Sequence, residues 1–208
     1  MLPRMKNLDP AIAALMISAA ADDAHAQFLL GYNYYIGNVD ENQEIYSAIH
    51  WFKKSINNNN TDAMYALGLI YIKEADPIRN TRKGIELVNN SASLGNTKAM
   101  YFVAIENLKG DLIPQNVDNY IMYLELAAFK YHYNSMIMLA NHYEVGDLFP
   151  ADKSKALALY RFARDADFSK AHELYTKLIF TMDYFEIERS KSFVRIDQIF
   201  FNKQSLTA

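Results

Sequence analysis

The chain repeats itself with a period of about 36 residues, and this period restricts the fold more than any other feature of the sequence. The segments Gly110–Pro114 and Gly146–Pro150 read Gly-Asp-Leu-Ile-Pro and Gly-Asp-Leu-Phe-Pro, 36 residues apart. Aligning the chain on this offset places a small residue, the anchor, at the same position of five units: Ala26, Ala63, Ala99, Ser135 and Ala171. Such a period is typical of helical hairpins in series, because a single hairpin cannot bury its apolar face alone.

Each unit predicts two helices. In the first helix an apolar residue follows the anchor by four positions and a small residue follows by five, as in Leu30-Gly31 and Leu67-Gly68. The second helix begins near Ala48, Gly84, Tyr120, Ala156 and Ser192 and, in the first four units, carries a large apolar pair three residues on, such as Trp51-Phe52. Small residues let two helix backbones approach closely, while large residues fill the gap to the next unit. Glycine at 37, 110 and 146 predicts a left-handed helix end in three units.

The stretches Ala19–Tyr32 and Ala63–Tyr71 carry the pattern most fully, and they resemble the Sel-1-like repeat (SLR) family, which is related to tetratricopeptide arrays. The resemblance implies an all-α fold, a right-handed α/α solenoid of about four to five helix-pair repeats with roughly 10–11 helices. It covers residues 11–165 well and residues 170–200 in outline. The glycine that the family has four residues before each anchor survives only as Gly95, and Asn59, Tyr131 and Asp167 replace it elsewhere.

This register predicts a single solenoid domain over residues 1–208. A partial N-terminal repeat occupies residues 9–25, four repeats occupy 26–62, 63–98, 99–134 and 135–170, and residues 171–208 form a degenerate repeat with a C-terminal capping helix. Tyr184 to Asn202 is predicted as one helix, whose heavy apolar face either seals the last repeat or docks a partner or a second copy.

The N-terminus supports two interpretations. Residues 1–6 are basic, residues 11–21 are apolar, and Ala24-His25-Ala26 imitates a signal-peptidase site, which would make the protein periplasmic or secreted. However, Asp9 and Pro10 separate the basic and apolar parts, and Asp before Pro is a helix start. The second interpretation is favoured, so residues 11–21 are predicted as a structural helix of a cytoplasmic protein.

Composition excludes several kinds of site. The chain has no cysteine, so it has no disulfide, Cys-ligated zinc or thiol nucleophile, and its seven scattered glycines form no phosphate-binding loop. The five histidines show no metal-ligand spacing. A net charge of −3 does not favour nucleic acid, and no apolar run is long enough for a membrane span. We expect no cofactor, metal or catalytic residue.

The first helices are expected to line the concave face of the solenoid, with positions +2, +6 and +9 from each anchor pointing into it. In the first three units these positions are all aromatic or aliphatic, with lysine at +10 in two of them. The candidate partner-binding residues are Phe28, Tyr32, Tyr35, Tyr65, Leu69, Ile72, Lys73, Tyr101, Ile105, Leu108 and Lys109. Tight curvature of the array could instead bury these side chains between repeats, and the sequence leaves both arrangements open.

The resemblance implies a non-enzymatic module that binds a protein or peptide partner in its concave face, as a bacterial adaptor or scaffold. Free-standing family members also resemble immunity proteins that neutralise a cognate toxin, and this is the alternative function. An enzyme or a metal-binding protein is a weaker alternative. The sequence does not give the oligomeric state.

The register makes a direct prediction about stability. Leu67 and Leu139 occupy the apolar +4 position, so Leu67→Glu or Leu139→Glu is expected to unfold the array cooperatively, because a carboxylate cannot be buried there unpaired. Circular dichroism and thermal melting measure the effect. Spectra and melting temperatures close to those of the wild type would show that the register is wrong.

Overall fold

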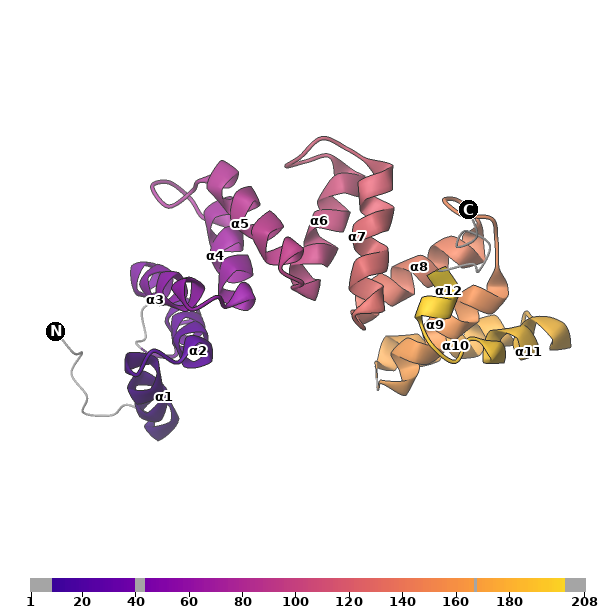
Figure 1. The fold of residues 1–208 in the computed structure, drawn as a ribbon, viewed down its shortest axis with the longest axis horizontal. Coiled ribbons are helices and arrows are strands. Elements are labelled where there is room, and N and C mark those ends of the chain that lie inside the picture. The colour runs from indigo at the N-terminus through magenta and orange to yellow at the C-terminus, as the bar shows by residue number, and fades with distance from the viewer. Residues whose placement is uncertain (1–8, 40–43, 167, 201–208) are drawn as a thin grey trace, which may run out of the picture. The chain divides into compact units, whose positions relative to one another are not determined.

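The computed structural model describes residues 9–39, 44–166 and 168–200, and within them it contains twelve α-helices and no strand (Figure 1). The helices are α1 Pro10–Ala20, α2 Ala24–Tyr35, α3 Ile45–Asn57, α4 Thr61–Lys73, α5 Thr81–Ser93, α6 Thr97–Lys109, α7 Val117–Phe129, α8 Tyr133–Val145, α9 Lys153–Asp165, α10 Ser169–Ile179, α11 Tyr184–Ser192 and α12 Asp197–Phe200. They form two compact units, Met1–Ala99 and Met100–Ala208.

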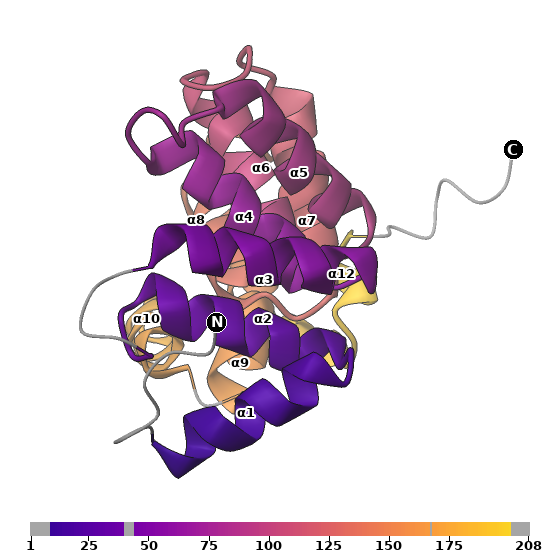
Figure 2. The same ribbon diagram turned by 90° about the vertical axis from the view of Figure 1, so that its left-hand side faces the viewer.

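In the first unit each helix packs against the next one in the chain, from α1 to α5. Figure 2 shows α1, α2, α3 and α4 side by side in chain order. Helix α1 begins as predicted, because the Asp9 carboxylate accepts a hydrogen bond of 2.8 Å from the backbone N–H of Ala11 and Pro10 is the first helical residue. Residues 1–6, which the signal-peptide interpretation requires, lie outside the described residues.

The predicted register is confirmed by burial. The anchors Ala26, Ala63, Ala99, Ser135 and Ala171 are all buried, and so are the +4 residues of the first four units. Only the fifth unit departs, since Thr176 at its +5 position is exposed. The all-α prediction is therefore correct, and the helix count exceeds the predicted 10–11 because α11 is followed by the short α12.

Helices α4 and α5 touch backbone to backbone at two glycines. A methyl group placed on Gly84 would lie 2.7 Å from the carbonyl oxygen of Gly68 and 2.7 Å from a side-chain carbon of Ile72. A methyl group on Gly68 would lie 2.9 Å from the carbonyl oxygen of Gly84. No real side chain fits at either distance, so the contact of these two helices requires the absence of both side chains.

Serine hydroxyls tie the second helix of a repeat to the start of its first helix. Ser55 Oγ donates to the carbonyl oxygen of Ala24 at 2.6 Å, and Ser91 Oγ donates to that of Thr61 at 2.7 Å. Both serines are buried and occupy the same register position. The hydroxyl therefore satisfies its own hydrogen bond where a small residue is required for packing.

The position that the family pattern fills with glycine is left-handed here even where glycine is absent. Asn59 and Tyr131 have φ values of 62° and 63°, while Gly95 has 97°. Asp22 has 63°. Asp167, the remaining substitution, lies outside the described residues. The turn geometry is thus imposed by the packing of the helices on either side, and asparagine and aspartate tolerate it better than tyrosine.

The second unit contains the larger core, which α7, α8 and α9 form together with residues from α10 and α12. Tyr120 and Tyr160 are its largest fully buried side chains. Tyr160 Oη donates to Asn141 and contacts Glu144 Oε2 at 3.1 Å. Loops Gly110–Pro114 and Gly146–Pro150 begin with left-handed glycines of φ 79°, as predicted from their repetition.

A series of hydrogen-bonded side chains links the core of the second unit to its surface. The Asp147 carboxylate lies 2.8 Å from His142 Nδ1, and His142 Nε2 lies 2.6 Å from the Tyr120 hydroxyl. Burial, followed by the negative charge of Asp147, raises the pKa of Tyr120 to about 12. The hydrogen bond from His142 lowers the pKa of Asp147.

The prediction of one helix from Tyr184 to Asn202 is wrong. Helix α11 ends at Ser192, and α12 begins at Asp197. The Arg161 guanidinium donates to the carbonyl oxygen of Phe193, which a continuing helix would use for its own ladder, and the Gln198 side chain accepts from the backbone N–H of Arg195. The break turns Ile196 and Ile199 into the core, where both are buried. Residues 201 and 202 lie outside the described residues.

The contact of Gly68 with Gly84 predicts the effect of a single methyl group. Gly84→Ala should lower the free energy of unfolding by about 1–3 kcal/mol through overpacking, although alanine is the better helix former by about 1 kcal/mol. Urea denaturation measures the change, and Asn90→Ala on the exposed side of α5 is the matched control. An increase in stability for Gly84→Ala would mean that the two backbones are further apart than described.

Buried tyrosines predict a loss of stability at high pH. Burial raises the pKa of Tyr120 and of Tyr143 from 10.0 to about 12, so between these values the unfolded chain has lost phenolic protons that the folded chain keeps. The unfolded state then binds fewer protons, and the free energy of unfolding falls as pH rises, by up to about 1.4 kcal/mol per pH unit for each tyrosine. Chemical denaturation at pH 9, 10 and 11 measures the slope. Tyr143→Phe should make the slope shallower, and an unchanged slope in this variant would contradict the assignment.

Candidate functional site: a pocket between α2 and α4

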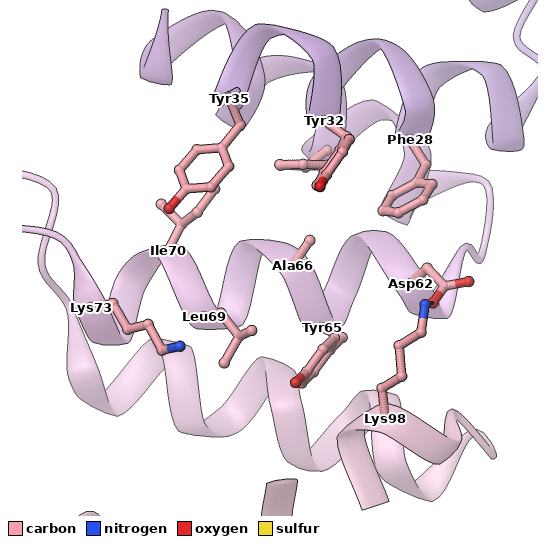
Figure 3. Close-up of a pocket in the computed structure, with 11 residues that line it drawn as sticks. Phe28, Tyr32, Tyr35, Asp62, Tyr65, Ala66, Leu69, Ile70, Lys73 and Lys98 are labelled. Carbon is pink, nitrogen blue, oxygen red and sulfur yellow. Dashed lines mark hydrogen bonds and ion pairs between the residues drawn. The ribbon is translucent and has the colours of Figure 1, made fainter. Parts of the chain in front are cut away.

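The first unit contains an apolar pocket of about 300 Å³ between α2 and α4. Figure 3 shows two facing rows of side chains, Phe28, Tyr32 and Tyr35 from α2 on one side and Tyr65, Leu69 and Lys73 from α4 on the other. Within each row neighbouring residues are three or four apart, which places them on one face of their helix. The pocket is therefore a direct product of the repeat, since equivalent positions of two consecutive units face each other.

The floor of the pocket is packed by the helix between the two rows. Phe52 of α3 is fully buried, and its ring centroid lies 5.9 Å from that of Phe28. Ala66 and Ile70 complete the α4 side. Tyr32 stays 47% exposed, so the apolar interior is open to solvent along the α2 row.

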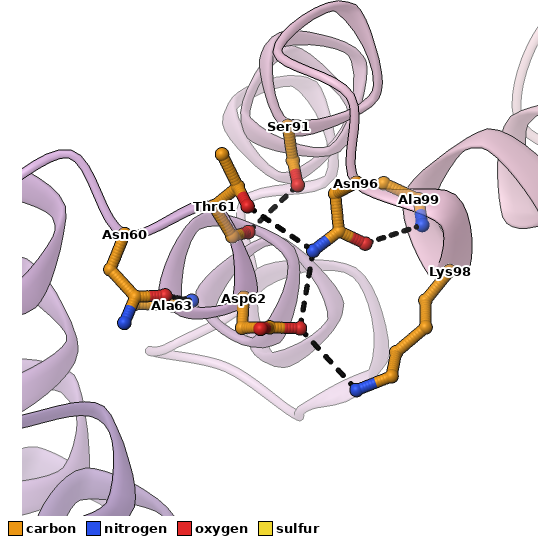
Figure 4. A network of polar contacts seen from close by, with 8 residues as sticks. All are labelled: Asn60, Thr61, Asp62, Ala63, Ser91, Asn96, Lys98 and Ala99. Atoms are coloured by element: carbon orange, nitrogen blue, oxygen red, sulfur yellow. Dashed lines mark hydrogen bonds and ion pairs between the residues drawn. The ribbon is translucent and has the colours of Figure 1, made fainter. Parts of the chain in front are cut away.

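One end of the pocket is closed by a polar network, drawn in Figure 4. Lys98, in the first turn of α6, lies 3.3 Å from the carboxylate of Asp62. Asn96 donates to the same carboxylate at 3.1 Å, and its side-chain oxygen accepts from the backbone N–H of Ala99 at 3.0 Å. The Asp62 carboxylate therefore neutralises Lys98 and fixes this end of the pocket.

The other end carries Tyr35, Lys73 and Glu74. The Tyr35 hydroxyl donates to Glu74 Oε1 at 3.0 Å, and burial, followed by this bond, raises the pKa of Tyr35. Burial also raises the pKa of Tyr65. Both phenols therefore stay neutral at physiological pH.

The structure brings six of the predicted partner-binding residues together in this pocket: Phe28, Tyr32, Tyr35, Tyr65, Leu69 and Lys73. Ile72 is placed differently, since its side chain fills the space beside Gly84 of α5. The reason is the close contact of α4 with α5, which turns the +9 position of α4 toward the neighbouring helix.

The remaining predicted residues belong to the second unit. Tyr101, Ile105 and Leu108 of α6 are half-buried and pack against that unit's own core. The Tyr101 ring lies 4.9 Å from the ring of His132. Lys109 is exposed at the end of α6. The prediction that all eleven residues bind a partner stays a prediction.

Sequence reasoning missed five residues that line the pocket: Phe52, Asp62, Ala66, Ile70 and Lys98. A usable signal existed for two of them, because Asp62 and Lys98 both stand one residue before an anchor and have opposite charges. Phe52 belongs to the large apolar pair that the register marks as filling the space between helices.

The pocket offers an apolar interior, neutral phenols and lysines, which is the chemistry of binding. Among the described residues, no three His, Asp or Glu side chains come together in a way that would hold a metal ion. In the hydrogen-bonded series Asp147–His142–Tyr120, the Tyr120 side chain is fully buried, so no substrate reaches its hydroxyl. In the described part of the chain no helix combines the length and hydrophobicity that a membrane crossing requires.

The sequence matches the family model of the Sel1 repeat four times, at residues 24–60, 61–96, 97–128 and 134–168. These matches begin two residues before the first three anchors and one residue before the fourth. No curated protein is similar enough in sequence to count as a match.

Solved structures share the fold. A protective antigen present in uropathogenic Escherichia coli strains, displaying an SLR fold, superposes with a TM-score of 0.71 at 19% identity over 95% of this chain. This chain spans 44% of that antigen's length. A Sel1 repeat protein from Oxalobacter formigenes superposes with a TM-score of 0.69 at 23% identity, covering 88% of this chain and 76% of its own.

A third solved structure aligns with this chain over nearly the full length of both proteins. An immunity protein from Pseudomonas aeruginosa superposes with a TM-score of 0.51 at 15% identity, covering 99% of this chain and 91% of its own. At these identities the three likenesses show a common fold of helical hairpins and no more.

Proposed function

The chain belongs to the Sel1 repeat family, and from this we propose that it is a non-enzymatic bacterial adaptor that binds a protein partner through the pocket between α2 and α4. Sel1 repeats generally form protein–protein interaction modules. The observation that carries the proposal is the convergence of six predicted side chains on one open, apolar pocket. Tyrosine is suited to such a surface, since it offers a large contact area with few rotatable bonds.

Several side chains of the pocket already have contacts within the protein, which favours recognition. Phe52 packs beneath Phe28, Glu74 accepts the Tyr35 hydroxyl, and Asp62 pairs with Lys98. Side chains that are placed before a partner binds reduce the conformational entropy that binding costs.

The second candidate function is immunity, in which the partner is a toxin domain that the protein neutralises. The observation that favours it is length, because the immunity protein from Pseudomonas aeruginosa aligns with almost the whole of this chain and with almost the whole of its own. A second Pseudomonas aeruginosa protein aligns over 99% of this chain and 92% of its own. In both functions we propose a cytoplasmic location.

The test removes the aromatic surface and keeps the fold. We expect the wild-type chain to retain a stoichiometric partner from lysate of its native host, and Tyr32→Glu/Tyr65→Glu to retain at least tenfold less, because two carboxylates would be buried in an apolar contact. Tyr46→Glu/Tyr184→Glu is the matched control, since both tyrosines are about two-thirds exposed and lie outside the pocket.

Circular dichroism of each variant shows that the helices persist, and the single variant Tyr32→Glu serves if the double variant unfolds. Undiminished retention by the folded pocket variant would overturn the proposal. Expression of the captured partner alone then separates the two functions: growth arrest that this chain relieves identifies immunity, and normal growth identifies an adaptor.

A further inference from the structure

The lysines at the two ends of the pocket differ in whether they form an ion pair. At one end, Lys98 is paired with Asp62, whose carboxylate also accepts from Asn96. At the other end, Lys73 is exposed, and none of the described carboxylates lies within ion-pair distance of its ammonium group. Of the two lysines that line the pocket, Lys73 is therefore the one that forms no ion pair with a described carboxylate.

Glu74 follows Lys73 directly and keeps its negative charge, but its Oε1 accepts the hydroxyl of Tyr35 at 3.0 Å and its carboxylate forms no ion pair with Lys73. Figure 3 shows the Lys73 side chain on the α4 row, beside Leu69. A carboxylate brought by a ligand would therefore meet a lysine that is not paired with any carboxylate of the described residues.

The apolar part of the pocket has room for one large side chain. Its volume of about 300 Å³ lies between the rings of α2 and the Tyr65, Ala66 and Leu69 side chains of α4. Burial of such a side chain removes its apolar surface from water, so it would anchor the ligand. The lysine would then select among the ligands that have such an anchor.

Helix geometry gives the spacing between these two features. Lys73 follows Leu69 by four residues and Tyr65 by eight, which at about 1.5 Å per residue is about 6 Å and about 12 Å along α4. An extended chain advances about 3.3 Å per residue. The ligand's carboxylate should therefore stand about two to four residues from its apolar anchor.

We propose that the pocket binds an internal segment of a partner protein that combines one large apolar side chain with an Asp or Glu two to four residues away. The apolar side chain lies between α2 and α4, and the carboxylate pairs with Lys73. The proposal rests on the proposed function and deepens it by giving the chemistry of the partner. The proposal commits to the carboxylate of an Asp or Glu side chain, and a terminal carboxylate is an outcome that the experiment distinguishes.

The experiment is a selection from a random peptide library displayed as internal segments, with the full-length chain as bait. We expect the wild type to enrich peptides in which Phe, Trp, Leu or Met is followed or preceded by Asp or Glu at a spacing of two to four. Lys73→Gln should lose the acidic preference and keep the apolar one, and Lys73→Glu should enrich Lys or Arg at the same spacing. For a selected peptide, Lys73→Gln should weaken affinity by up to about fivefold, as the loss of an exposed ion pair does.

A matched control separates recognition from a general effect of charge. Lys53 is exposed on α3 and does not line the pocket, so Lys53→Gln removes a lysine of the same unit outside the pocket. This variant should select the same peptides as the wild type.

Three results would overturn the proposal. The first is that the enriched peptides lack acidic residues, and the second is that Lys73→Gln keeps the acidic preference. The third is enrichment only in a parallel library with free C-termini, which would assign the charge to a terminal carboxylate. Failure to enrich any peptide also counts against it. The proposed function is judged separately. If Tyr32→Glu/Tyr65→Glu loses the native partner and the selected peptides show no acidic preference, the pocket remains a binding site and only the role of Lys73 is removed.

Discussion

The described structure depends on how closely two helix backbones can approach. At Gly68 and Gly84 the approach leaves no space for even a methyl group. Buried alanine occupies several equivalent positions of other units, namely Ala48, Ala104, Ala140 and Ala156. Close approach brings the remaining side chains of each helix into dense contact, and in a repeat protein such contacts between neighbours replace a single central core. The small residues that define the 36-residue period are therefore the residues on which packing depends, which is why the period is so clear in the sequence.

The pocket follows from the same packing. Once α2 and α4 are held at a fixed separation with α3 behind them, the faces that do not touch a neighbour are left as two opposing rows. Phe28 still packs on Phe52, and Tyr65 is half-buried, so both contribute to the packing of the unit. Tyr32 stays 47% exposed, and its aromatic ring is the one of these three that packing explains least.

Much of the fold was predictable from the sequence because it depends on periodic features. The anchors, the capped start of α1 and the left-handed glycines at 110 and 146 all follow from residue type and spacing. The break between α11 and α12 was not predictable, since it depends on Arg161, which lies more than thirty positions away. Its guanidinium donates a hydrogen bond to the carbonyl oxygen of Phe193. In the pocket, spacing identified the two rows. It could not place Ile72, whose direction is set by the missing side chain of Gly84, nor identify Lys98, which comes from the following repeat.

That contribution of Lys98 has a consequence for how the site can evolve. The pocket takes its rows from α2 and α4, its floor from α3 and one end from the first turn of α6, so three successive repeats contribute to one pocket. Duplication, loss or exchange of a single repeat would replace part of the pocket while leaving the other helical hairpins intact. The specificity that we propose for this pocket is therefore a property of the junctions between repeats, which recombination of repeats would change.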